Sequence, residues 1–221
     1  MPLSDPSYTR LKRLQIWTGI LPVGLFLLSH LVTNARAIAG AEVFDRAAAQ
    51  IGRIPFLVAI EVGAIALPML VHVALGIMLA MTPQAAGDAG GYPRPWMLLA
   101  QRATGFFLVV YVVFHVSATR LSIARLRGAQ DLFDLMARQL EQPAVFAFHA
   151  AGVLAAAFHF GNAFVGLAGP WGLNAGPRAQ AVAARCGVVA FIALSLIGLL
   201  ALLAFVHPAF RWLERAPALA P

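Results

Sequence analysis

The sequence contains few charged residues and a single cysteine. Of its 221 residues, 11% are charged and 61% are hydrophobic, whereas soluble domains contain about 25% charged and about 45–50% apolar residues. This difference excludes an ordinary soluble domain and an intrinsically disordered chain. Because Cys186 has no second cysteine to pair with, the chain has no intrachain disulfide and no cysteine-rich zinc or iron–sulfur site. The composition predicts an integral membrane protein.

Acidic residues are also scarce. The chain has 9 Asp and Glu against 16 Lys and Arg, which gives a formal net charge of +7. The basic residues lie between apolar runs instead of forming one patch, and this distribution is typical of positions that flank membrane helices. We therefore expect lipid, and not nucleic acid, to be the surrounding partner.

Long apolar runs are what the sequence has in abundance. A bilayer core about 30 Å thick is crossed by roughly 20 apolar residues in a helix, and barrel strands would be shorter and alternating. The connectors, such as 82–95 and 169–180, are rich in glycine and proline and too short for a soluble domain. The sequence predicts one all-α transmembrane domain over 1–221, with helices at about 15–37, 55–82, 96–119, 143–168 and 184–207.

The basic cluster before the first run bears on orientation. Arg10, Lys12 and Arg13 precede a run that is longer than the apolar region of a signal peptide and is followed by four more spans, so we interpret it as a retained helix. Counted over the whole chain, with this cluster included, seven basic residues lie on the side of the N-terminus and nine on the other, which gives no positive-inside signal. Since the first helix usually dominates topology, the cluster favours a cytoplasmic N-terminus and an external C-terminus.

Four histidines recur at nearly equal intervals along the first four runs. The steps from His30 to His72, His115 and His159 are 42, 43 and 44 residues, each one helix plus one connector. With a rise of about 1.5 Å per residue, His30 lies roughly 6 Å and His115 roughly 9 Å beyond the middle of its helix, toward the exit side. His72 and His159, on helices that run the other way, lie toward the opposite side. The spacing predicts two layers, each with two histidines.

Two facing histidines at one depth make an axial pair for a haem iron, so two layers predict two stacked haems enclosed by the first four helices. Zinc is a poorer fit, because it requires about four close ligands and the spans contain no cysteine cluster and one carboxylate. The alternative for each histidine is that it binds no cofactor and is a buried side chain hydrogen-bonded to a neighbour. Four histidines in two layers favour the haem.

Three further side chains are candidates for roles near these layers. His149 lies ten residues before His159, about 15 Å along the helix, and we expect it near the outer pair, in a quinone pocket or the haem environment. Its side chain should point about 80° away from that of His159, which favours a quinone-pocket or packing role over ligation. Glu61, the carboxylate within a span, is a candidate proton relay for a quinone or a glutamate at a helix end. Arg102 is a candidate for binding haem propionates or an interfacial anchor. Pro22 and Pro68 are expected to kink the first and second helices.

At these residues the chain resembles the cytochrome b membrane anchor of succinate:quinone oxidoreductases, in the five-helix, two-haem, single-polypeptide class. The resemblance covers nearly all of Tyr8 to Val206. The segments that carry it are GILPVGLFLLSHLVTN (19–34), GAEVFDRAA (40–48), EVGAIALPMLVHVALGIMLA (61–80), QRATGFFLVVYVVFHVSATR (101–120), FHFGN (158–162) and WGLNAGPRAQ (171–180).

The resemblance implies a set of ligands, partners and an orientation. It implies that His30 and His115 bind a distal haem b, and that His72 and His159 bind a proximal haem b near a flavoprotein and an iron–sulfur subunit. It also implies a cytoplasmic N-terminus in the bacterial cytoplasmic membrane. The function expected from it is electron transfer between those subunits and a membrane quinone, menaquinone in this class, with the dicarboxylate chemistry of succinate dehydrogenase or fumarate reductase in the partners. His149 matches no ligand of the family.

Two alternatives remain open at the level of sequence. One is another membrane di-haem cytochrome b, such as the electron-accepting subunit of a hydrogenase. The order of one histidine on each of helices one to four argues against it. The other is a haem-free proton or ion pathway that uses the histidines as relays.

Overall fold

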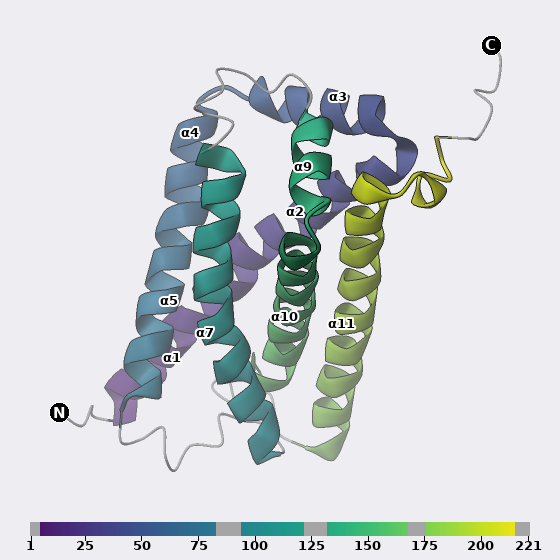
Figure 1. Cartoon of the computed structure of the whole chain (residues 1–221). Helices are drawn as coiled ribbons and strands as arrows, with labels where there is room; N and C mark the ends of the chain where they lie inside the picture. The colour runs from purple at the N-terminus through teal and green to yellow at the C-terminus, as the bar shows by residue number, and fades with distance from the viewer. Residues whose placement is uncertain (1–4, 83–93, 122–131, 168–175, 215–221) are drawn as a thin grey trace. The chain divides into compact units, whose positions relative to one another are not determined.

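The computed structural model describes residues 5–82, 94–121, 132–167 and 176–214, and every regular element within these ranges is helical (Figure 1). Most of connector 82–95 and part of connector 169–180 lie outside the described residues. Within these ranges five helices are long and apolar enough to cross a membrane, which confirms the predicted all-α membrane architecture. They are Pro6–Ala39, Leu57–Ala80, Pro95–Ala118, Pro143–Gly166 and Arg178–Val206.

The first and fifth spans begin earlier than their apolar runs. The first span starts with α1 (Asp5–Thr18), which includes Arg10, Lys12 and Arg13. The fifth is α11 (Pro177–Val206), which begins about seven residues before the expected 184. Hydropathy marks the part of a helix that lipid can surround, whereas backbone hydrogen bonds continue the helix through polar residues, so apolar length underestimates both helices.

Two spans contain π-helical turns close to a proline. In the first span η1 (Gly19–Val23) contains Pro22 and leads into α2 (Gly24–Asn34) and η2 (Ala35–Ala39). The second span runs through α4 (Leu57–Ile60), η3 (Glu61–Ala66) and α5 (Leu67–Ala80), with Pro68 near the start of α5. Proline lacks the N–H that an α-helix needs, and a π turn accommodates the missing bond. Both spans thus depart from a regular α-helix close to their proline, and the kinks expected at Pro22 and Pro68 stay predictions.

The remaining spans are regular. They are α7 (Pro95–Ala118) and α10 (Pro143–Leu167), together with α11. The chain divides into two compact units, and α7, α10 and α11 each pass from one into the other. Unit 1 comprises Met1–Leu27, Val58–Val109 and Ala155–Ala193, and unit 2 comprises Leu28–Leu57, Val110–Leu154 and Leu194–Pro221.

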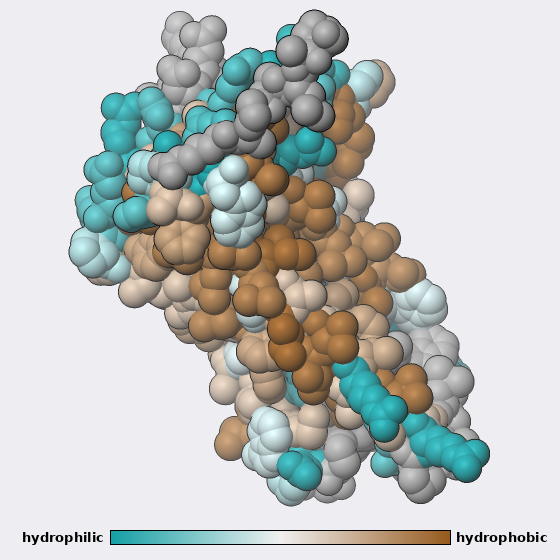
Figure 2. All heavy atoms as spheres, turned by 90° about the vertical axis from the view of Figure 1, so that its right-hand side faces the viewer, coloured by the Kyte–Doolittle hydropathy of each residue, from teal (hydrophilic) through white to brown (hydrophobic). Residues whose placement is uncertain are grey.

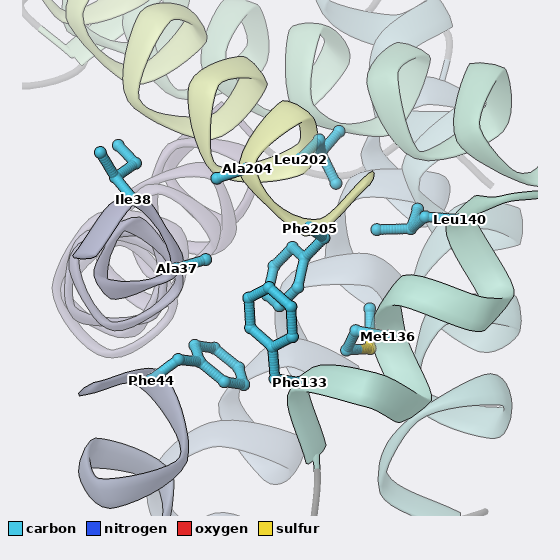
Figure 3. Close-up of a cluster of buried hydrophobic side chains, with 9 residues drawn as sticks. All are labelled: Ala37, Ile38, Phe44, Phe133, Met136, Leu140, Leu202, Ala204 and Phe205. Atoms are coloured by element: carbon cyan, nitrogen blue, oxygen red, sulfur yellow. The ribbon is translucent and has the colours of Figure 1, made fainter. Parts of the chain in front are cut away.

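Unit 2 contains two short amphipathic helices that the sequence analysis did not predict, α3 (Ala41–Gly52) and α9 (Leu132–Leu140). They meet the end of α11 in a buried cluster of apolar side chains (Figure 3). The rings of Phe44, Phe133 and Phe205 pack with centroids 5.0–6.1 Å apart. The Phe133 N–H donates to Asp45 Oδ1 at 2.9 Å, so α3 caps the first turn of α9.

Large hydrophobic side chains are exposed on the surface of the spans. Leu99 is 69% exposed, Val110 63% and Val189 66%. Figure 2 shows such side chains covering much of one face of the molecule. A soluble monomer rarely exposes so much apolar surface, and surrounding lipid removes the cost of that exposure. The chain is a multi-pass membrane protein.

Candidate functional site

Two histidines from different spans face each other in unit 1. His72 comes from α5 and His159 from α10, and both are half-buried. Their ring centroids lie 6.2 Å apart with an interplanar angle of 81°. The structure therefore brings together the two histidines that were predicted to share one layer.

A backbone carbonyl determines which nitrogen of His72 carries the proton. His72 Nδ1 lies 2.7 Å from the carbonyl oxygen of Gln15 in α1. A carbonyl oxygen only accepts hydrogen bonds, so Nδ1 must carry the hydrogen and Nε2 must keep its lone pair. A second hydrogen bond of this kind is what orients most metal-binding histidines. His72 therefore presents an unprotonated Nε2, the form of the ring that can bind a metal.

A hydroxyl group does the same for His159. Thr104 Oγ1 lies 3.2 Å from His159 Nδ1 and 2.7 Å from the carbonyl oxygen of Ala100, to which it donates. Because the single hydroxyl hydrogen is used in that bond, Oγ1 accepts from Nδ1. His159 Nε2 consequently keeps its lone pair, and both histidines of unit 1 have the same tautomer.

Polar side chains also fix the backbone around His159. Gln101 Nε2 donates to the carbonyl oxygen of His159 at 3.1 Å. Asn162, which is 6% exposed, donates to Gln101 Oε1 at 2.9 Å and to the carbonyl oxygen of Met97 at 3.0 Å. The sequence analysis missed the roles of Thr104, Gln101 and Asn162. The available signal was three uncharged polar residues within long apolar helices, where each requires a partner.

Two glycines leave room for the rings of His72 and His159. A Cβ atom at Gly19, in η1, would overlap the ring of His72, and a Cβ at Gly105 would lie 3.2 Å from Cε1 of His159. Only hydrogen fits comfortably beside each ring. These glycines therefore serve the histidines directly, through the close approach that a missing side chain permits.

The second predicted pair meets in unit 2. His30 from α2 and His115 from α7 have ring centroids 5.7 Å apart and an interplanar angle of 83°. The Asn34 side-chain amide donates to the carbonyl oxygen of His30 at 2.8 Å and lies 3.3 Å from His30 Nε2. Tyr111 stacks on His115, with an interplanar angle of 20°. His115 Nδ1 is buried and has no hydrogen-bonding partner among the described residues.

His149 lies beside this second pair. Its side chain is 1% exposed, and its ring centroid is 5.7 Å from that of His115 and 5.8 Å from that of Tyr111. His149 Nδ1 donates to the carbonyl oxygen of Val145 at 3.0 Å. The structure thus places His149 near the histidine pair at which the sequence analysis expected it.

The other two candidates lie in unit 1. Glu61 is the first residue of η3 and Arg102 follows Gln101 in α7, and both side chains are half-buried. Each of them takes part in interactions of its own. The quinone and propionate roles stay predictions.

A comparison with known proteins decides the family. The chain is 40% identical over 195 residues to the succinate dehydrogenase cytochrome b558 subunit of Bacillus subtilis (strain 168), an alignment that covers 88% of this chain and 96% of that protein. The chain belongs to the succinate dehydrogenase cytochrome b subunits. No family model and no solved structure matches the chain. A cytochrome b subunit of this kind is a component of an enzyme complex.

Cytochrome b subunits carry haem b, and the histidine pairs fit that group. A histidine nitrogen lies about 2 Å from a transition metal and the ring centroid about 1 Å farther, so two imidazoles on opposite sides of one iron have centroids roughly 6 Å apart. The pairs of this cytochrome b subunit lie at 6.2 and 5.7 Å. Within the described ranges no three His, Cys, Asp or Glu side chains converge on one point.

Proposed function

We propose that this chain is a di-haem cytochrome b that anchors succinate dehydrogenase in the membrane and connects it electronically to a quinone. The observation that carries the proposal is the pair in unit 1. His72 and His159 face each other at 6.2 Å, and both have Nδ1 engaged and Nε2 free to bind iron.

Each histidine pair has one task in this proposal. His72 and His159 hold the proximal haem b, and His30 and His115 hold the distal one. When bound, haem b supplies reversible one-electron transfer. Ligation by two histidines would suit electron transfer instead of oxygen chemistry. The Gln15 carbonyl and the Thr104 hydroxyl keep the imidazoles oriented and hold the Nδ1 protons away from the metal side.

The soluble chemistry belongs to partner subunits. We propose a flavoprotein and an iron–sulfur subunit as partners, bound on the cytoplasmic side of the bacterial cytoplasmic membrane. The N-terminus lies on that side, where Arg10, Lys12 and Arg13 precede the first span, and the C-terminus lies outside. The chain itself offers one cysteine and therefore no cysteine-ligated cluster.

The quinone site is the second half of the proposal. Menaquinone is the proposed substrate, and Glu61 moves protons to or from it, since quinone chemistry couples electrons to protons. Arg102 binds the propionates of the proximal haem, because its guanidinium is suited to carboxylates.

Purification of the intact complex tests the proposal. We expect a pyridine haemochrome assay to give two haems b per chain, and mass spectrometry to identify a flavoprotein and an iron–sulfur protein. His72→Ala and His159→Ala should each lose one haem. His207→Ala is the matched control, because His207 accepts the Ala209 N–H at the end of α11 and belongs to neither pair. Absence of a reduced b-type absorption band from the native complex would refute the proposal and favour an ion pathway.

A further inference from the structure

We propose that segment 51–56, which joins α3 to α4, is a lipid-binding contact at the surface of the bilayer. Phe56 and Ile54 insert among the acyl chains, and Arg53 binds the phosphate of an anionic phospholipid. The segment lies within unit 2. The inference goes beyond the proposed electron-transfer function and rests only on the membrane class of the chain.

The backbone at Phe56 has a conformation that its side chain disfavours. Its φ is 56°, and within the described residues it is the only residue other than glycine with a positive φ. The Leu57 N–H donates to the carbonyl oxygen of Ile54 at 3.2 Å, so Pro55 and Phe56 occupy the two central positions of a turn. Proline followed by a positive φ is the pattern of a type II turn, in which glycine or asparagine is the usual third residue because a bulky side chain there is strained.

The part of the chain that the structure describes does not compensate for this strain. The Phe56 side chain is 86% exposed and makes no ring contact with another described residue. A strained conformation persists where other interactions outweigh it. A glycine would form the same turn without strain, so the ring of Phe56 requires a partner outside the chain.

The surroundings of Phe56 identify that partner as lipid. Ile51 and Ile54 are also exposed, so three large apolar side chains lie within six residues. The next residue, Leu57, begins a candidate membrane span, which places the segment where this helix meets the surface of the bilayer. Segments that lie in that surface combine Phe and aliphatic side chains with basic ones. Continuity with a lipid-covered helix favours lipid over a second polypeptide.

Arg53 supplies the polar half of the contact. Its side chain is exposed and makes no ion pair with another described residue, whereas the guanidinium of Arg46, on α3, pairs with Glu42. A guanidinium binds phosphate oxygens well, and its long stem lets the charge stay among the headgroups while neighbouring apolar groups insert. An anionic phospholipid offers both the phosphate and the opposite charge.

Photocrosslinking of the full chain in lipid nanodiscs tests the proposal. Phe56→p-benzoylphenylalanine keeps an aromatic ring at this position and, on irradiation, bonds covalently to whatever lies beside it. The nanodiscs contain phosphatidylcholine and phosphatidylglycerol in equal amounts, and mass spectrometry identifies the adduct. We expect phospholipid adducts with an about fivefold excess of phosphatidylglycerol, the preference that one basic side chain gives at a lipid surface.

Two arginine variants and one position within a span are the controls. Combined with the photoreactive residue at position 56, Arg53→Gln should abolish the excess of phosphatidylglycerol. Arg46→Gln should leave it, because Arg46 already pairs with Glu42. Val110→p-benzoylphenylalanine, at an exposed position of α7, should form adducts with the two lipids in equal amounts.

Three results would overturn the proposal. A crosslink from position 56 to a second copy of the chain or to another polypeptide would show a protein interface, and the absence of any adduct would place the ring in water. An excess of phosphatidylglycerol that survives Arg53→Gln would show that Arg53 does not bind the headgroup. If the Phe56 variant does not accumulate, Ile54→p-benzoylphenylalanine, in the same segment, is measured in the same way.

Discussion

Thr104 Oγ1 accepts a hydrogen bond from His159 Nδ1 at 3.2 Å while it donates its own hydrogen to the carbonyl oxygen of Ala100. The hydroxyl also lies 3.1 Å from the carbonyl oxygen of Gln101; because both carbonyl oxygens can only accept, this arrangement favours the tautomer of His159 with the hydrogen on Nδ1. A residue on α7 thereby sets the electronic state of a proposed iron ligand on α10.

Thr104→Val removes the acceptor and keeps the shape of the side chain. Without it, Nδ1 withdraws less electron density from its hydrogen and the ring becomes a weaker donor to ferric iron, so the reduction potential of the proximal haem should rise. We expect a rise on the order of tens of millivolts, since a tenfold change in relative affinity corresponds to about 59 mV for one electron. Redox titration of the purified complex measures it.

Two matched variants accompany this measurement. Thr104→Ser keeps the hydroxyl and should restore the native potential. Thr33→Val removes a hydroxyl that bonds only to the Ser29 carbonyl oxygen in its own helix at 2.9 Å, and it should change nothing. An unchanged potential in Thr104→Val would show that the hydroxyl does not influence the haem.

Gly19→Ala should disturb the proximal haem. The added Cβ would overlap the ring of His72, so the imidazole must rotate away from the Gln15 carbonyl and from the position that faces His159. We expect loss of one of the two haems, or a shifted low-spin signal, in the absorption and resonance spectra. Gly63→Ala is the control, because Gly63 also lies in a π turn of a span and its Cβ would meet nothing within 4 Å. Equal spectra for Gly19→Ala and Gly63→Ala would contradict the claim that the missing side chain at Gly19 leaves room for the ring of His72.

Glu61→Gln should slow quinone turnover and leave both haem spectra unchanged. The amide keeps the size of the carboxyl group and one acceptor oxygen, but it cannot take up or release a proton. Steady-state succinate:quinone activity gives the first readout and the haem spectra give the second. Native turnover in this variant would remove Glu61 from the proton path.

Asp45→Ala should destabilise unit 2 through the first turn of α9. Phe133 N–H loses its acceptor, and loss of such a cap costs about 1 kcal/mol, which lowers the melting temperature by about 2–4 °C in a chain of this size. Thermal unfolding in detergent measures it. Asp134→Ala, which removes an exposed carboxylate from the same turn, is the control and should have a smaller effect; equal shifts would show that charge, and not the cap, is responsible.

The histidine pairs illustrate how far sequence reasoning reached. The intervals of 42, 43 and 44 residues and the fixed rise of a helix predicted which histidines share a layer, and His72 with His159 and His30 with His115 do face each other. The short helices α3 and α9 escaped prediction, since their apolar faces are too short to register as spans and become interpretable only against Phe205 of α11.

The sequence by itself determined the membrane class, the number of spans and which histidines lie together, because hydropathy and helical rise are local properties of the chain. Tertiary structure alone decided which nitrogen of His72 and of His159 keeps its lone pair. Gln15 and Thr104 are 57 and 55 residues away from the histidines they orient, and His149 meets His115 from another helix. A tautomer depends on what surrounds the ring, and only the folded chain provides those surroundings.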